Sequence, residues 1–357
     1  MSSVKSVGVH LGLAVVAGIT ALSLWTKEAE PEAVTAASAQ VQVWSGTPDQ
    51  LEFIAFEGKE LKVKVEPKKD ELGRWFVVHL NQVKRQSKDP ENPHESPENP
   101  HAPPSKAAKE PKGEWVKSSF VSVKGGTTLA EALAPLMALR AVGRIDKERA
   151  EEFGFDKPEG TLTVKLKGAE HKLTVGGLTP GGGDRYVRLA GSNEAYAVPG
   201  DALRGVLQPD TRLLETNLHQ FDSADVKRVK VTYADKSREL LRVEGKPNAW
   251  ASVENPLEQD ETAVNWMSKV DRLRVSEYLP KQPPALGPNA LVLRIEYFDA
   301  KKSIGFTELF KTPAEPGAES KDKYIVRTET TRWYGEVLAS RAEQVERDVG
   351  SVVGGGK

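Results

Sequence analysis

Cysteine is absent from the chain's 357 residues. Its absence excludes disulfide bonds, thiolate zinc sites, iron–sulfur clusters, cysteine nucleophiles and a lipid-modified cysteine anchor. It does not decide the cellular compartment, because many proteins outside the cytoplasm also lack disulfides.

A surplus of charge of either sign is also missing. The chain has 50 Lys and Arg residues against 51 Asp and Glu residues, a formal net charge of -1. A nucleic-acid-binding protein normally shows a basic surplus or a dense basic stripe, so we predict no nucleic-acid partner. Apolar residues make up 38% and charged residues 28% of the chain, as is typical of a folded protein with a polar surface.

Recognisable catalytic motifs are the third absence. The chain has no Gly-x-Ser-x-Gly elbow, and Gly181-Gly182-Gly183-Asp184 is not followed by the Gly-Lys-Ser/Thr of a phosphate-binding loop. The prolines of Pro93–Pro97 prevent the helix that a zinc-protease motif would need around His94. We interpret this segment as a solvated linker. The alternative is that His94 and His101 together bind a metal ion loosely. Three further histidines lie on or beside strand-like segments and are interpreted as structural: His79, His171 and His219.

The absence of these motifs leads to a negative prediction about chemistry. We assign no catalytic, cofactor-binding or metal-binding residue, and we predict no cofactor. The sequence does not decide whether the protein is an enzyme, and a function without catalysis is the favoured hypothesis.

A long segment without charged residues lies near the N-terminus. From Val7 to Trp25 no residue carries a formal charge. A helix of about 19 residues spans about 28 Å, close to the bilayer's hydrocarbon core of about 30 Å. Because Lys5 precedes this segment and glutamates follow it, the positive-inside rule places the N-terminus in the cytoplasm. We predict a cytoplasmic tip and transmembrane anchor at residues 1–27, a linker at 28–48, and a single-pass protein of the bacterial inner membrane with its bulk in the periplasm.

Two other interpretations of this segment stay open. Ala37-Ser38-Ala39 has the small-x-small form that signal peptidase prefers, so the segment could be a cleaved signal peptide. A long acidic spacer before Ala39 and the length of the apolar stretch favour the anchor. A buried core helix is the third interpretation.

The rest of the chain runs through one pattern of elements twice. Each copy opens with a predicted β-hairpin, continues with a lone tryptophan on a short strand (Trp115 or Trp250) and then with a helix, and closes with a second hairpin and a third strand. In the first copy we expect Thr128 to cap the helix, since Glu131 lies at the capping-box spacing. We predict that the two copies superpose with Trp115 on Trp250 and Tyr186 on Tyr324.

This pattern sets the predicted fold class and the domain boundaries. We predict an α+β protein, in which an N-terminal transmembrane helix precedes two tandem repeats of an antiparallel or mixed sheet, each with one main helix. The first repeat occupies residues 49–213 and contains a disordered, Pro- and charge-rich insertion at 86–112. The second repeat occupies 221–349, and a flexible tail follows at 350–357.

Two pairs of arginines recur at similar places in the copies. Arg140 and Arg274 follow the helices, and Arg188 and Arg327 follow the tyrosines of the third strands. Pairing with buried carboxylates is the favoured interpretation of these four residues. Lining an interaction surface is the functional alternative, and they are therefore our candidates for partner contacts.

A short motif connects the chain to a known family. Gly154-Phe155-Asp156-Lys157-Pro158, Val175-Gly176 and Tyr186-Val187-Arg188 resemble the motifs of a bacterial family known as domain of unknown function 4340. The likeness covers about Leu51 to Leu213 well and the second copy loosely, since Leu286-Gly287-Pro288 lacks the aspartate. The resemblance implies an N-terminal anchor and, because the family's genes often neighbour those of gliding-type ABC transporters, an accessory role at such a complex. It implies no catalytic residue.

These observations favour an accessory, assembly or binding subunit of an envelope complex such as a gliding-type ABC transporter. The expected partners are the membrane, through the anchor, and membrane proteins, including ABC transporter subunits. The alternatives are a hydrolase of envelope polymers and a secreted ligand-binding protein, which would require cleavage at Ala39.

Overall fold

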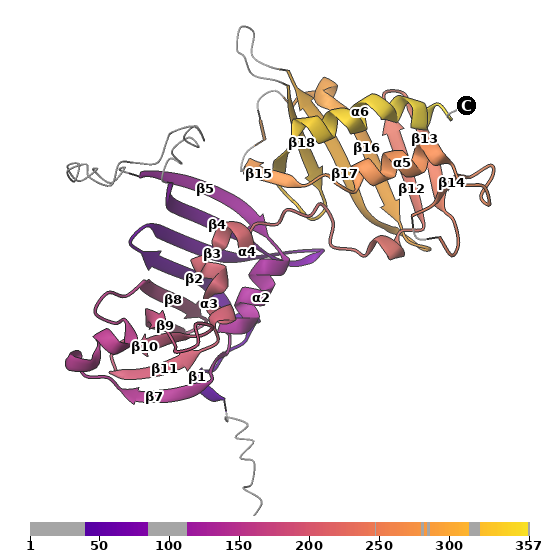
Figure 1. Ribbon diagram of the computed structural model, residues 1–357. Helices are drawn as coiled ribbons and strands as arrows, with labels where there is room; N and C mark the ends of the chain where they lie inside the picture. Colours follow the sequence, from indigo (N-terminus) through magenta and orange to yellow (C-terminus); the bar gives the residue numbers. More distant parts are fainter. Residues whose placement is uncertain are drawn as a thin grey trace, which may run out of the picture. The chain divides into compact units, whose positions relative to one another are not determined.

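The computed structural model describes residues 40–84, 113–246, 248–279, 282–283, 286–313 and 322–355 (Figure 1). The predicted transmembrane span at 7–25, most of the predicted linker and the whole of the predicted insertion at 86–112 lie outside these residues. The described end of that linker is not irregular. It contains strand β1 (Val41–Trp44), which forms a two-stranded sheet with β6 (Leu136–Ala138).

The first copy is built on a nine-stranded sheet in the order β5-β4-β3-β2-β8-β9-β10-β11-β7. Every neighbouring pair in it is antiparallel. In chain order its strands are β2 (Leu51–Gly58), β3 (Leu61–Asp70), β4 (Gly73–Lys84), β5 (Glu114–Ser122), β7 (Arg140–Arg144), β8 (Gly160–Leu166), β9 (Ala169–Leu178), β10 (Arg185–Leu189) and β11 (Glu194–Val198).

Three helices accompany this sheet, and the figure shows α2, α3 and α4 on one side of it (Figure 1). They are α2 (Lys124–Leu133), α3 (Gly200–Leu207) and α4 (Pro209–Arg212). Helix α2 begins four residues before the predicted cap at Thr128, and the hydroxyl of Ser122 accepts a hydrogen bond from the Gly126 amide at 2.8 Å. The predicted capping box is therefore wrong. Leu129 and Leu133 of α2 are buried, and the indole of Trp44 donates to the Leu133 carbonyl at 2.8 Å.

The second copy is an eight-stranded, wholly antiparallel sheet in the order β14-β13-β12-β16-β17-β18-β19-β15. Its strands are β12 (Arg228–Tyr233), β13 (Lys236–Arg242), β14 (Trp250–Ser252), β15 (Val275–Leu279), β16 (Leu291–Phe298), β17 (Ser303–Thr312), β18 (Lys323–Thr328) and β19 (Tyr334–Val337). Helices α5 (Glu261–Val270) and α6 (Ala339–Val353) lie together over one face (Figure 1).

Helix α5 has a clear start signal and a single buried stripe. The Asp260 carboxylate caps it by accepting from the Ala263 amide at 2.9 Å. Trp266 is 1% exposed, and its indole donates to the Val345 carbonyl of α6 at 2.9 Å. This hydrogen bond ties the two helices together over the sheet.

The strand order of the two sheets repeats. On one side of β2 or β12, each sheet continues to its hairpin partner, β3 or β13, and then to one further strand, β4 or β14. On the other side, each sheet continues through five strands, the last of which follows the first helix. The first sheet has one strand more, β5, at its edge beyond β4. By position, β14 therefore corresponds to β4 and not to β5.

This extra strand separates the two tryptophans that we expected to superpose. Trp115 lies on the edge strand β5 and is 43% exposed, whereas Trp250 on β14 is 3% exposed. The predicted equivalence of Trp115 and Trp250 is therefore wrong. The short motif around each tryptophan could not reveal an added edge strand, because both strands immediately precede the helix.

The predicted fold class is wrong. Among the described residues no helix has both the length and the apolar character needed to cross a membrane, so the N-terminal transmembrane helix of that prediction is not supported. The large sheets are antiparallel throughout, not mixed. The predicted main helix of the second repeat, α5, is not the longest helix there: the 15-residue α6 exceeds it, because a buried stripe of valines at Val345, Val349 and Val352 extends α6 over the sheet. Helix α6 also takes in residues up to Val353 of the predicted flexible tail.

Candidate functional site

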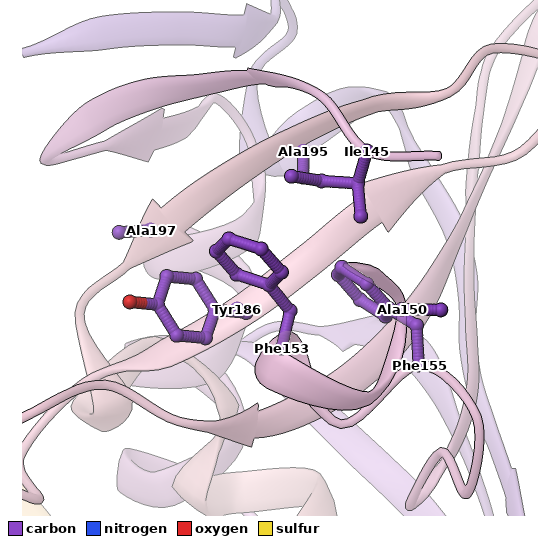
Figure 2. Packing of buried hydrophobic residues seen from close by; sticks show 7 residues of the cluster. All are labelled: Ile145, Ala150, Phe153, Phe155, Tyr186, Ala195 and Ala197. Atoms are coloured by element: carbon purple, nitrogen blue, oxygen red, sulfur yellow. The ribbon is translucent and has the colours of Figure 1, made fainter. Parts of the chain in front are cut away.

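Two residues of the family motif, Phe155 and Tyr186, lie in one hydrophobic cluster on the first sheet (Figure 2). Phe153 and Phe155 come from the segment after β7 and lie beside Tyr186 of β10. The Phe153 and Tyr186 rings meet edge to face at 4.9 Å between centroids. The remaining members of the cluster are Ile145, Ala150, Ala195 and Ala197.

The two glycines of the motif permit a close backbone approach. Gly154 has φ +70, and a Cβ there would lie 2.5 Å from the Gly177 nitrogen. A Cβ on Gly176 would lie 2.5 Å from the Phe153 carbonyl oxygen. Both distances are shorter than any side chain tolerates without a shift of the backbone, so the motif fixes this segment against the sheet. These residues have a structural role, and they present no group for chemistry.

Arg188 and Arg327 occupy equivalent positions. Arg185 pairs with the last residue of β11, and Tyr324 pairs with the last residue of β19. Counting from these pairs, Arg188 matches Arg327, whereas Tyr186 matches the residue after Tyr324. The predicted superposition of the two tyrosines is therefore off by one residue.

The surroundings of these two arginines differ. The guanidinium of Arg188 lies over the ring of Phe155 at 4.9 Å, and its cross-strand neighbour is Thr174. Arg327 faces Glu308 instead, and its Nη2 and Nε bond one carboxylate oxygen at 2.6 and 2.8 Å. Pairing with a carboxylate therefore describes Arg327 and not Arg188.

Arg327 belongs to a group on the face of the second sheet opposite α5 and α6, which we term the outer cluster. Its members are Arg294, Phe306, Glu308, Arg327 and Tyr334. The Glu308 side chain is 8% exposed and also pairs with Arg294. Arg294 lies over Phe306 at 5.1 Å, and Arg327 lies 5.6 Å from the centroid of Tyr334. The two arginine side chains remain 37% and 39% exposed, so the cluster presents oriented guanidinium groups to solvent.

Arg140 and Arg274 do not form a matched pair. Arg140 is exposed on β7, the edge strand of the first sheet. Arg274 precedes β15, and its Nη1 donates to the carbonyls of Asp271 and Leu273 at 2.7 Å each. Arg274 also lies on the rim of a cavity that the sequence did not reveal.

This cavity, the α5 pocket, lies in the second copy between the C-terminal end of α5 and one end of the sheet. Its volume is about 280 Å³. Charged or titratable groups in its wall are His219, Arg242, Asp271 and Arg274, and the aromatic residues are Phe221, Trp250 and Tyr297. Apolar residues complete it: Leu218, Val226, Met267, Val270 and Leu273.

His219 is held in the wall by a hydrogen bond at each of its two ring nitrogens. Its Nδ1 lies 2.7 Å from Glu329 Oε1, and its Nε2 lies 3.0 Å from the Thr307 hydroxyl. The ring stacks on Phe221 at 4.6 Å and meets Tyr297 at the same distance. This hydroxyl–imidazole–carboxylate chain has the composition of a nucleophile relay. Thr307 is 0% exposed, however, and its hydroxyl cannot reach a substrate in this arrangement.

Among the described residues, Arg242 and Asp271 are charged groups of the pocket that, like Arg274, form no ion pair. The Arg242 guanidinium stacks on Trp250 at 4.5 Å, and burial lowers its pKa. Asp271 is exposed at the edge of the pocket, and partial desolvation of its carboxyl by the neighbouring wall raises its pKa, an effect that Arg242 opposes. Within the part of the chain that the structure describes, neither side chain forms an ion pair. A half-buried charge such as that of Arg242 in a concave, partly aromatic wall is typical of a ligand site.

Sequence reasoning found Arg274 and Trp250 and missed the rest of the pocket. Arg242 ends β13, and Asp271 follows α5, so nothing in their local sequence marks them. His219 was interpreted as structural. No group of three or more His, Asp or Glu side chains suited to a metal ion occurs within the described ranges.

Comparison with protein families confirms the predicted resemblance. The model of the family described as Domain of unknown function (DUF4340) matches residues 127–290. The matched segment begins inside α2 and extends through β15 of the second copy, so it overlaps the expected residues 51–213 only from residue 127 onward and continues into the second copy. No curated protein and no solved structure matches the chain.

Proposed function

We propose that this protein is a binding subunit of an extracytoplasmic complex and that it acts by contact. The observation that carries the proposal is the outer cluster. Arginine and aromatic residues dominate the binding energy of protein interfaces. A guanidinium that is already fixed loses less conformational entropy when it binds.

The contacts within the outer cluster explain why its guanidinium groups are fixed in orientation. Glu308 pairs with Arg294 on one side and Arg327 on the other, while the rings of Phe306 and Tyr334 support the guanidinium planes. Glu308 compensates one of the two positive charges, and Glu296, 3.4 Å from Arg294, compensates the other. A partner would therefore contact exposed guanidinium edges and ring surface, without the long-range attraction of a highly charged patch.

The family resemblance suggests where the partner is found. Family members are often encoded beside gliding-type ABC transporters, so subunits of such a transporter are the proposed partners. The extracytoplasmic location belongs to the same proposal and rests on the sequence.

Co-purification with the transporter subunits tests the proposal. Arg327→Ala should weaken association at least tenfold, the loss typical of an interface hot spot. Arg188→Ala is the matched control, because Arg188 holds the equivalent register position and lacks the carboxylate partner. Association that survives Arg327→Ala and Arg294→Ala in folded protein would exclude this surface.

A second candidate function, hydrolysis, is favoured by the Thr307–His219–Glu329 chain. The burial of Thr307 opposes it. Thr307→Val removes the hydroxyl and nearly keeps the shape. If this change abolished function in cells while folding and partner association stayed intact, we would infer that the protein acts as a hydrolase and not through binding alone.

A further inference from the structure

The α5 pocket contains a guanidinium that is oriented but incompletely bonded. Arg242 Nε donates to the Val226 carbonyl at 2.7 Å, and the guanidinium plane stacks on Trp250 at 4.5 Å. These two contacts fix the plane and use one of its donors. The Nη1 and Nη2 groups have no hydrogen-bond partner among the residues that the structure describes.

A guanidinium with two free Nη groups is suited to a planar anion. Carboxylates pair with arginine through two parallel N–H···O bonds, and the geometry is favourable when the arginine is already fixed. Arg228, another stacked arginine of the second copy, differs in this respect, because it stacks on Phe298 at 4.0 Å and pairs with Glu239 at 2.7 Å.

Much of the remaining pocket wall is apolar and aromatic. Tyr297 and Met267 are 3% and 2% exposed, and both line the cavity together with Phe221 and Val270. The volume of about 280 Å³ lies just below the usual range of about 300–1,000 Å³ for small-molecule sites. The pocket therefore accommodates one small ligand with an apolar body.

The helix end beside the pocket limits the charge of that ligand. Asp271 is the C-cap of α5, so the pocket lies at the negative end of the helix dipole. Together with the Asp271 carboxyl, this end opposes a doubly charged anion such as a phosphate monoester. A single carboxylate pairs with Arg242 at the least electrostatic cost.

We propose that the α5 pocket binds a small monocarboxylate with an aromatic or branched apolar body, and that Arg242 pairs with its carboxylate. Arg274 at the rim adds a second positive charge on the path of entry. The site is independent of the outer cluster, which lies on the opposite face of the same sheet.

Titration calorimetry with phenylacetate as the probe tests this site. Phenylacetamide is the matched neutral probe, because it keeps the ring and lacks the charge. We expect phenylacetate to bind the full chain with a Kd of about 1 mM or tighter and the amide to bind at least tenfold more weakly. Equal affinities for the two probes, or no binding of phenylacetate, would overturn the proposal.

Substitutions in the α5 pocket test whether phenylacetate binds there. Arg242→Gln should weaken phenylacetate binding at least tenfold, whereas the control Arg228→Gln, outside the pocket, should change it less than about twofold. Asp271→Asn keeps a polar side chain and removes a negative charge, so it should tighten binding several-fold even if Arg242→Gln fails to fold. Unchanged binding in Asp271→Asn, or equal losses in the two arginine variants, would contradict the assignment.

Discussion

Replacing Gly154 by alanine tests the structural role of the family motif. Two terms contribute to the expected cost. A non-glycine residue at φ +70 costs about 1–2 kcal/mol. The new Cβ would also lie 2.5 Å from the Gly177 nitrogen and 2.8 Å from its Cα, and such overpacking against backbone costs about 1–3 kcal/mol. The sum is about 2–5 kcal/mol of unfolding free energy.

Gly168 provides the control. It has φ +83, and a Cβ there would meet nothing within 4 Å, so Gly168→Ala carries the backbone term alone. Urea denaturation of both variants, followed by near-UV circular dichroism, should show Gly154→Ala less stable than Gly168→Ala by about 1–3 kcal/mol. Equal losses would show that the segment does not lie as close to the sheet as described, and the structural explanation of the motif would fail.

Two further predictions concern the second copy. Trp266→Phe removes the donor to the buried Val345 carbonyl and should cost about 1–3 kcal/mol in denaturant unfolding; an unchanged midpoint would show that this hydrogen bond adds nothing. Asp271→Asn should raise the melting temperature at pH 7. Because the folded state raises the pKa of Asp271, ionisation of its carboxyl opposes folding above the unfolded pKa, and the gain should vanish as pH falls below about 4. A gain that persists at pH 3 would point to another cause.

The repeated order of elements was visible in the sequence because hairpins and helices have their own periodicities. The alignment of particular residues was not, since one added edge strand moved Trp115 to a different position from Trp250. A bulge beside Arg185 likewise accompanies the one-residue offset between the tyrosines. Local patterns specify elements, whereas register and edge strands depend on pairing with distant strands.

The candidate sites show the same limit. Arg327 was found because it recurs, but its partner Glu308 comes from a neighbouring strand and has no counterpart in the first copy, where Thr174 occupies that place. The α5 pocket combines residues from the loop before β12, from β13 and β14, from α5 and from β16. No spacing along the chain could bring these residues together, and only the fold reveals them.

The central claim, that the protein works by contact through the outer cluster, is tested most directly by Glu308→Gln. This change keeps both arginines and all ring surface but weakens the charge pairing that orients the guanidinium groups. If pre-organised arginines mediate binding, affinity for the transporter subunits and function in cells should fall together, by about tenfold in affinity, in protein that remains folded. Full function with lost association, or full association with lost function, would contradict the account.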